Sequence, residues 1–514
     1  MTGAGAIIGS LAECGVTACF SNPGTSEMHL VTALDREPRI RSVLCLFEGV
    51  ATGAADGFAR MAGTPALTLL HLGPGYLNGG ANIHNARRAY SPMINLIGDH
   101  AVSHRALDAP LASDIAGLAG PNSRWLRSVD RVQDAGRLAA EAFAASFGPP
   151  PGPVSLVMPA DTAWTKGGSL FRADERPGLR KVSDGVVEDA ARAIRAARRP
   201  AILVNGATAT DKGLIALARL EARGVMVVVD TFIARQARGG GRFVPRRLSY
   251  FAEAAIKDLD GVDLLLVAGT KPPVAFFAYP NTPGILSPPG ADVFSLGGPE
   301  IDAGDAVAKL AEAIGATQPP PVAEGRPPAP PPDKFNAYTI GLCLAHRLPE
   351  NAIISDDGVT GGLPVYLATA QAQRHDWLCQ TGGAIGQGMP AAIGAAAARP
   401  DSKVVCLSGD GAGMYTVQSL WTMAREDLDI LTIVFVNNAY KILKVELART
   451  GAGNPGPAAL GLLNLGNPDI DWVSLAKGMG VGAEATTTLG EFDAALERAM
   501  NHNGPRLIAA MLPD

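Results

Sequence analysis

The chain has 514 residues, a net charge of −5 at pH 7, and a composition that is 47% hydrophobic and 18% charged. This length predicts two to four domains, each large enough to bury its own core. The 44 basic residues are balanced by 49 acidic ones and form no basic block. The charge pattern therefore argues against binding to nucleic acid or to a membrane surface.

The cysteines and the amino-terminal stretch indicate the cellular compartment of the protein. Six cysteines occur, with no CxxC pair. The first residues, MTGAGAIIGSLAECG, lack a basic segment followed by a long apolar core, and no apolar run reaches the ~18 residues that a membrane span needs. We therefore expect a cytoplasmic protein without a membrane span, whose thiols are reduced and mostly buried.

Residues 1–165 predict a first α/β domain. Alternation of apolar runs with Ala-rich, helix-like stretches predicts a parallel sheet that is covered by helices on both faces. The first three runs are each followed by a polar or glycine-containing segment, so we expect a shared site at that edge of the sheet. The apolar runs are residues 18–20, 43–47, 66–70, 93–97 and 154–158.

Glu48 and His71 are the most distinctive polar residues at this edge. Glu48 stands between an apolar strand and an Ala/Gly-rich helix, but an ordinary carboxylate at a helix N-terminus would look the same in sequence. His71 directly follows a strand, where a hydrogen-bonded structural histidine is the plainer interpretation. The residues alone leave both alternatives open.

Two further α/β domains are predicted, at residues 181–317 and 334–514. The middle one contains a helix-like stretch at 187–198 and four apolar runs. Its three consecutive glycines, 239–241, lie between arginines and form no GxGxxG after a strand, so they give no argument for a dinucleotide. The proline-rich segment 318–332, QPPPVAEGRPPAPPP, predicts an extended tether between the two domains.

The strongest signal lies in residues 404–443. An apolar strand runs into Gly409-Asp410-Gly411, a helical segment follows, and a second apolar strand ends at Asn437-Asn438. This order predicts a βαβ unit, whose right-handed crossover brings the two strand ends to one crevice. Asp410 and Asn438 are therefore expected to meet.

Oxygen ligands at this crevice suit a hard cation. Mg²⁺ prefers a few protein oxygens together with phosphate oxygens and water. The Asp410 carboxylate, the Asn438 amide oxygen and the main-chain carbonyl of Tyr440 would leave room for a diphosphate. Gly411 would allow the backbone to approach the phosphate closely, and a helix N-terminus would offer further N–H groups.

The GDG run followed by NN resembles the signature of thiamine diphosphate enzymes. The similarity to the acetolactate synthase large-subunit and benzoylformate decarboxylase branch extends over nearly the whole chain. The resemblance implies three doubly wound α/β domains, which would be pyrimidine-binding, middle and diphosphate-binding. It also implies thiamine diphosphate, Mg²⁺, and active sites shared between subunits of a homodimer or homotetramer. Some members hold FAD in the middle domain, and the sequence leaves a flavin open.

The resemblance assigns roles to residues of the first domain. A glutamate at the position of Glu48 protonates the pyrimidine ring of the cofactor. A histidine at the position of His71 takes part in proton transfer in benzoylformate decarboxylase, and Thr25, in NPGTSE, stands where that enzyme has an active-site serine. Pro23 and Asn78 match positions that line the cofactor.

The resemblance also assigns roles in the third domain. Ile385 matches the bulky apolar residue that supports the bent cofactor, although a core side chain is the alternative interpretation. Thr360 would place a hydroxyl near the diphosphate, and Leu443 would contribute to a pocket wall that suits a small aliphatic 2-oxo acid better than an aromatic one. The cofactor-binding set implied for this domain is Thr360, Ile385, Gly409, Asp410, Gly411, Ala412, Asn438, Tyr440 and Leu443.

Three functions are compatible with these residues. The first is decarboxylation of a small 2-oxo acid with transfer of the remaining fragment to an acceptor, as in acetolactate synthase. The second is simple decarboxylation, as in benzoylformate decarboxylase, but the middle-domain histidine expected near residues 274–279 is missing from VAFFAY. The third is a cofactor-binding paralogue without turnover, against which the intact Glu48 and metal loop argue.

Overall fold

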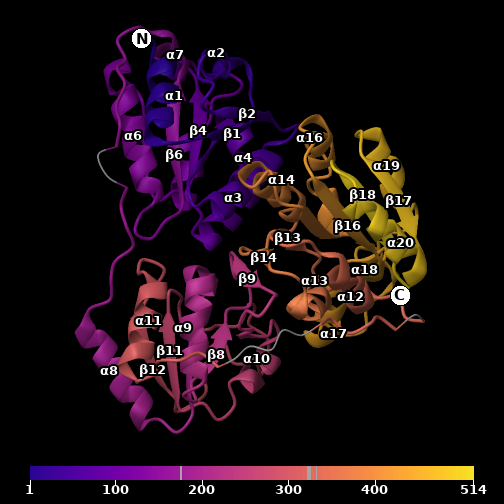
Figure 1. Ribbon diagram of the computed structural model, residues 1–514. Coiled ribbons are helices and arrows are strands. Elements are labelled where there is room, and N and C mark those ends of the chain that lie inside the picture. The colour runs from indigo at the N-terminus through magenta and orange to yellow at the C-terminus, as the bar shows by residue number, and fades with distance from the viewer. Residues whose placement is uncertain (174–175, 321–325, 332, 514) are drawn as a thin grey trace.

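The computed structural model describes residues 1–173, 176–320, 326–331 and 333–513. It contains three separate sheets, each flanked by its own helices (Figure 1). The prediction of three α/β domains is therefore confirmed, while their exact boundaries stay predictions. Part of the proline-rich segment predicted as a tether, residues 321–325 and 332, lies outside the described residues.

The first sheet has six parallel strands in the order β2-β1-β3-β4-β6-β5. The apolar run 43–47 was expected to be one strand, but β2 ends at Leu44. Phe47 instead precedes a helix, and its carbonyl accepts the N–H groups of Val50 and Ala51. Hydrophobicity does not mark this end, because Cys45, Leu46 and Phe47 are apolar although they lie outside the strand. The elements are α1 (Gly3–Cys14), β1 (Ala18–Asn22), α2 (Met28–Asp35), β2 (Arg41–Leu44), α3 (Glu48–Ala62), β3 (Ala66–Leu70), α4 (Leu72–Ala89), β4 (Met93–Asp99), α5 (Ile115–Ala119), β5 (Leu126–Ser128), α6 (Ala135–Ser146), β6 (Pro153–Pro159) and α7 (Ala160–Trp164).

The middle sheet has five parallel strands in the order β10-β8-β7-β11-β12. Each of the four apolar runs predicted here forms a strand, with bounds that differ by only one or two residues. The elements are α8 (Asp184–Ala196), β7 (Pro200–Val204), α9 (Asp211–Glu221), β8 (Met226–Val229), β10 (Arg246–Arg247), α10 (Ala252–Asp258), β11 (Leu264–Ala268), β12 (Asp292–Gly297) and α11 (Ala303–Ala313).

The third sheet has seven strands in the order β17-β18-β16-β15-β13-β14-β9. One edge strand, β9 (Gln236–Arg238), comes from the middle part of the chain and pairs antiparallel with β14. The glycines at 239–241 follow it with positive φ, which lets the backbone turn tightly. The other elements are α12 (Ala337–Arg347), β13 (Ala352–Asp357), α13 (Gly362–Ala368), β14 (His375–Cys379), α14 (Gly388–Ala398), β15 (Val404–Gly409), α15 (Asp410–Met414), α16 (Ser419–Arg425), β16 (Ile430–Val436), α17 (Lys441–Arg449), α18 (Pro457–Gly461), α19 (Trp472–Gly478), β17 (Gly482–Thr486), α20 (Leu489–Met500) and β18 (Arg506–Met511).

Helices α3 and α14 join the first and third domains (Figure 1). They approach closely because small residues face each other where they touch. A Cβ at Gly57 of α3 would lie 2.1 Å from the Ala391 carbonyl oxygen, and a Cβ at Gly394 of α14 would lie 1.8 Å from that of Ala54. The backbone of one helix therefore rests directly on the other.

We expect the substitution Gly57→Ala to destabilise the protein by about 1–3 kcal/mol. An added methyl group between two tightly packed backbones forces them apart, and this cost exceeds the gain in helix propensity. The matched control is Gly185→Ala in α8, where a Cβ meets nothing within 4 Å. Urea unfolding of both variants measures the effect; equal or higher stability of Gly57→Ala would contradict the packing described.

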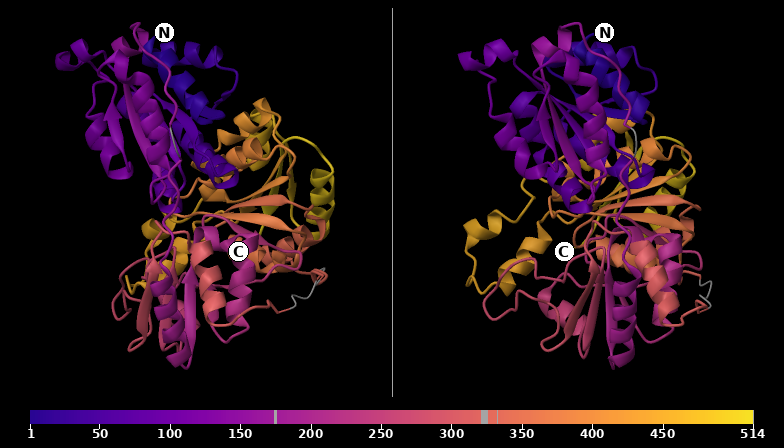
Figure 2. Two further views of the ribbon diagram at one scale, coloured as in Figure 1. Left: turned by 60° about the vertical axis from the view of Figure 1, so that its left-hand side comes forward. Right: turned by 90° about the vertical axis from the view of Figure 1, so that its left-hand side faces the viewer.

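Helices α17 and α18 project from the body of the third domain (Figure 2). Neither of them has a buried residue. Within the described parts of the chain, no helix combines the length and the apolar character that crossing a membrane requires.

Candidate functional site

The carboxyl ends of β1, β2 and β3 bring together the predicted residues of the first domain. Glu48 is the first residue of α3, and only 6% of it is exposed. Asn78 of α4 donates a hydrogen bond from Nδ2 to Glu48 Oε2 at 3.0 Å. A Cβ at Gly75 would lie 3.3 Å from both Glu48 Oε1 and His71 Cβ. Glu48 is thus a buried carboxylate at a helix N-terminus, and it lies close to His71.

A second carboxylate, Glu27, holds His71 in place. Glu27 is fully buried, and its Oε2 lies 2.8 Å from His71 Nδ1 and accepts the N–H of Gly24 at 2.8 Å. Because an ionised carboxylate only accepts hydrogen bonds, this contact assigns the ring proton to Nδ1. The Nε2 atom of neutral His71 is then left as an acceptor on a side chain that is 21% exposed.

The hydroxyl that contacts His71 belongs to Ser26. Its Oγ lies 3.2 Å from His71 Nδ1 and donates to Glu27 Oε1 at 2.6 Å. Thr25, the predicted hydroxyl, is exposed and begins the short 3₁₀ turn that follows Gly24, and Pro23 is half-buried. Gly24 is required here, because a Cβ on it would lie 2.1 Å from the imidazole.

Asp410 organises the predicted metal loop. It begins α15 directly after β15, and only 3% of it is exposed. Its Oδ1 accepts the N–H of Gly411 at 2.8 Å, and its Oδ2 accepts those of Asn437 at 3.0 Å and Asn438 at 2.7 Å. Burial raises the pKa of the Asp410 carboxyl, while these N–H groups favour the charged form. The two loops predicted to meet therefore do meet.

Asn438 and Tyr440 lie beside this carboxylate. Asn438 has a positive φ of 51°, and its buried Oδ1 has no hydrogen-bond partner among the described residues. A buried amide oxygen without a partner is costly, so such an atom calls for an unseen partner. The Tyr440 carbonyl accepts the N–H groups of Leu443 at 2.9 Å and Lys444 at 3.2 Å. The aromatic ring of Tyr440 covers Gly411.

The other predicted cofactor residues of the third domain differ in their surroundings. Ala412 is buried within α15, whereas Leu443 on α17 is 45% exposed. Ile385 and Thr360 are both half-buried. The loop that contains Thr360 borders Gly409, since a Cβ added to Gly409 would lie 4.0 Å from Val359 Cγ2. Thr360 and Gly409 therefore share one edge of the third sheet.

The two groups belong to different domains of the chain. Within the described residues, no hydrogen bond or ion pair joins the Glu48 and His71 group to the Asp410 and Asn438 group. Each group lies at the carboxyl ends of the strands of its own sheet.

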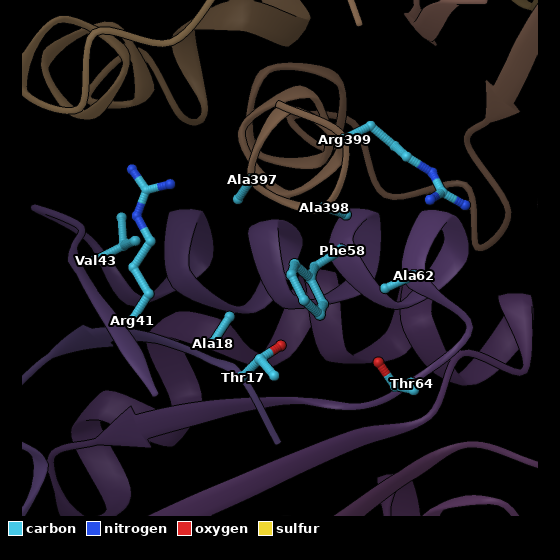
Figure 3. Close-up of a pocket in the computed structure, with 10 residues that line it drawn as sticks. All are labelled: Thr17, Ala18, Arg41, Val43, Phe58, Ala62, Thr64, Ala397, Ala398 and Arg399. Atoms are coloured by element: carbon cyan, nitrogen blue, oxygen red, sulfur yellow. The ribbon is translucent and has the colours of Figure 1, made fainter. Parts of the chain in front are cut away.

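A cavity of about 340 Å³ lies at the opposite edge of the first sheet (Figure 3). Phe58 lies in its centre, with Arg41 and Arg399 on opposite sides. It is lined by residues at the amino ends of the strands, such as Thr17 and Thr64, and includes no predicted site residue. The candidate site is therefore formed by loop residues outside this cavity.

Sequence reasoning missed Glu27. The residue was visible in the motif NPGTSE, and its position three residues after Gly24 is typical of a capping carboxylate. What the sequence did not show is that the β1 loop folds back over the end of β3, where the same carboxylate reaches His71.

Comparison with known proteins identifies the domains. Residues 1–117 match the family described as Thiamine pyrophosphate enzyme, N-terminal TPP binding domain. Residues 360–510 match Thiamine pyrophosphate enzyme, C-terminal TPP binding domain. The two matched segments contain, respectively, the Glu48 group and the Asp410 group.

Similar proteins extend over the whole chain. A Mycobacterium tuberculosis (strain ATCC 25618 / H37Rv) protein, provisionally named acetolactate synthase large subunit IlvX, is 46% identical and covers 100% of this chain and 99% of its own length. Benzoylformate decarboxylase of Pseudomonas aeruginosa is 28% identical, with 96% of each chain covered.

A solved structure shares the fold. The thiamine diphosphate-dependent 4-hydroxybenzoylformate decarboxylase of Rhodococcus jostii RHA1 has a TM-score of 0.86 and 23% identity, with 99% of each chain covered. The two family matches and the 46% identical relative show that the chain belongs to the family of thiamine pyrophosphate-dependent enzymes.

Proposed function

We propose that this protein uses thiamine diphosphate and Mg²⁺ to decarboxylate a small 2-oxo acid, and that it joins the remaining fragment to an acceptor. The observation that carries the proposal is a buried Glu48 in one cofactor-binding domain together with a buried Asp410 and the buried amide oxygen of Asn438 in the other. The relative named as an acetolactate synthase large subunit supports carboligation as the outcome. When bound, thiamine diphosphate supplies the nucleophilic carbon and accepts the electrons that decarboxylation releases.

The first domain would hold the pyrimidine side of the cofactor. The Glu48 carboxyl would hold a proton at the pyrimidine ring, with Asn78 fixing its orientation through the 3.0 Å hydrogen bond. His71 would present Nε2 to the substrate, since Glu27 occupies Nδ1. Pro23 and Thr25 would line the same opening.

The third domain would hold the diphosphate and the metal. The free Oδ1 of Asn438 fits a cation ligand, because it is a buried oxygen without a hydrogen-bond donor among the described residues. Asp410 and the Tyr440 carbonyl would complete the protein ligands, and oxygen donors of this kind are what Mg²⁺ prefers. A divalent ion would also offset the cost of burying the Asp410 charge. Ile385, Thr360, Gly409, Gly411, Ala412 and Leu443 would line the cofactor.

A homodimer or a homotetramer would complete each site. Glu48 and Asp410 lie in different domains of one chain, so a second copy could set its first domain against the third domain of the other. The proposed reaction assigns no role to the middle domain or to FAD.

Simple decarboxylation with release of an aldehyde is the second candidate. The contact between His71 and the buried Glu27 favours it, because a carboxylate at Nδ1 stabilises a protonated His71, which can deliver its Nε2 proton to the product. The two reactions differ in what replaces the carboxylate: a proton gives the aldehyde, whereas an acceptor carbonyl gives a new carbon–carbon bond.

Release of carbon dioxide from a panel of 2-oxo acids tests the proposal. The panel contains pyruvate and benzoylformate, and products are identified after incubation with thiamine diphosphate and Mg²⁺. Acetolactate from pyruvate supports carboligation, whereas acetaldehyde or benzaldehyde supports simple decarboxylation. Thermal stabilisation by the cofactor without carbon dioxide from any acid would overturn both and favour a paralogue without turnover.

We expect Glu27→Gln to lower kcat at least tenfold while leaving the affinity for thiamine diphosphate unchanged. A neutral amide can keep the geometry, but it stabilises a protonated His71 less than a carboxylate does. The measurement is the pH dependence of kcat. The part of this curve that depends on protonation of His71 should shift to a different pH. Glu37→Gln, a half-buried carboxylate outside the candidate site that pairs with Arg39, is the control. An unchanged pH profile would contradict a role for Glu27 in proton transfer.

A further inference from the structure

Residues 380–387, here named the Ile385 loop, connect β14 to α14. It is rich in glycine, and Gly383 and Gly386 have φ values of 80° and 91°. Glycine-rich segments lose more backbone entropy on ordering than others, so contacts from outside must fix their position. The structure shows which contacts these are.

The second half of the loop is held by its own domain. Asp357 Oδ2 accepts the N–H groups of Gly386 at 2.7 Å and of Gly388 at 3.1 Å. The Thr416 hydroxyl donates to the Gly386 carbonyl at 2.9 Å. Burial raises the pKa of the Asp357 carboxyl to about 7, and the hydrogen bonds from the loop favour its charged form.

The first half of the loop is held by the first domain of the same chain. Asn85 of α4 donates from Nδ2 to the Ala384 carbonyl at 2.8 Å, and its Oδ1 accepts the Ala384 N–H at 3.3 Å. The Thr381 hydroxyl donates to the Asn85 carbonyl at 2.8 Å. Helix α4 comes so close that a Cβ at Gly382 would lie 2.5 Å from Asn85 Oδ1.

The same asparagine is connected to the start of α3. Asn85 Nδ2 also donates to Asn82 Oδ1 at 3.0 Å, and Asn82 Nδ2 donates to the Gly49 carbonyl at 2.7 Å. Both asparagines are buried. A hydrogen-bonded path therefore runs from Ala384, next to Ile385, to Gly49, next to Glu48.

We propose that Asn85 is a positioning residue that sets the Ile385 loop of the third domain relative to the Glu48 end of α3 in the first domain. The inference rests on the proposed role of Ile385 in supporting the cofactor. Asn85 touches neither cofactor nor substrate in this scheme; it acts through the backbone of Ala384. In an assembly with active sites shared between subunits, Asn85 would connect Ile385 and Glu48 of one chain, which would belong to different active sites.

Amide hydrogen exchange of the cofactor-free protein tests the positioning directly. In Asn85→Ala we expect faster exchange in peptides that cover the Ile385 loop, together with about tenfold weaker binding of thiamine diphosphate in calorimetry at saturating Mg²⁺. Tenfold corresponds to the loss of one or two ordinary hydrogen bonds. Asn85→Asp keeps the acceptor for the Ala384 N–H but sets a buried carboxylate oxygen against the Ala384 carbonyl and Asn82 Oδ1, so we expect a change at least as large in the same direction.

Asn95→Ala is the matched control. Asn95 is also a buried asparagine of the first domain, and it accepts one hydrogen bond, from Thr68 Oγ1 on the neighbouring strand β3. We expect it to lower stability without changing loop exchange or cofactor affinity. Wild-type exchange in the loop of both Asn85 variants would overturn the inference. Because exchange is read without substrate, this result is independent of which reaction the enzyme performs.

Discussion

Replacement of Glu48 by glutamine is expected to lower the release of carbon dioxide from the preferred 2-oxo acid by about 10²–10⁴-fold, the range typical of the loss of a general acid or base. The amide keeps the size of the side chain and can still accept the hydrogen bond from Asn78. It cannot exchange a proton with the pyrimidine ring. Binding of thiamine diphosphate should therefore change much less than turnover.

Two measurements separate this loss from damage to the fold. Calorimetry of cofactor binding should give similar affinities for the variant and the wild type, and kcat should carry nearly all of the effect. Glu188→Gln, an exposed glutamate of α8, is the matched control and should retain full activity. Retention of more than a tenth of wild-type activity by Glu48→Gln would contradict the assigned role.

The sequence predicted the parts of the fold that depend on apolar patterning. Strand β16 (Ile430–Val436) ends directly before Asn437-Asn438, as predicted, because a fully buried parallel strand is apolar throughout and ends at polar residues. Strand β14, which includes the partly polar start His375-Asp376, was missed. It pairs with β13 on one side and with β9, from another part of the chain, on the other. No local pattern reports such a distant partner.

The candidate site shows the same limit. Asp410 and Asn438 could be placed together because they follow the two strands of one βαβ unit. These strands, β15 and β16, are parallel neighbours, so the residues after them lie close together. Glu27 could not be placed, since its contact with His71 depends on how the loop after β1 folds. The partners of the Ile385 loop were also hidden, because Asn85 and Ala384 are separated by 299 positions.

Replacement of Asp410 by asparagine is the second large change, and it is expected to abolish stabilisation by thiamine diphosphate with Mg²⁺. A ligand at 100 times its dissociation constant stabilises a protein by about 2.7 kcal/mol, which is the stabilisation we expect to disappear. The reason is the loss of a negative oxygen ligand beside Asn438 Oδ1, which has no other partner among the described residues.

The asparagine is chosen over alanine because Asp410 also accepts three backbone N–H groups. An amide oxygen can still accept part of these bonds, whereas alanine would leave all three donors buried without a partner and weaken the fold itself. Thermal unfolding with and without ligands measures the difference. Asp471→Asn, an exposed helix-capping carboxylate of the same domain, should keep the full ligand-dependent shift. If Asp410→Asn kept that shift as well, the metal loop would not be where the cation and the diphosphate bind.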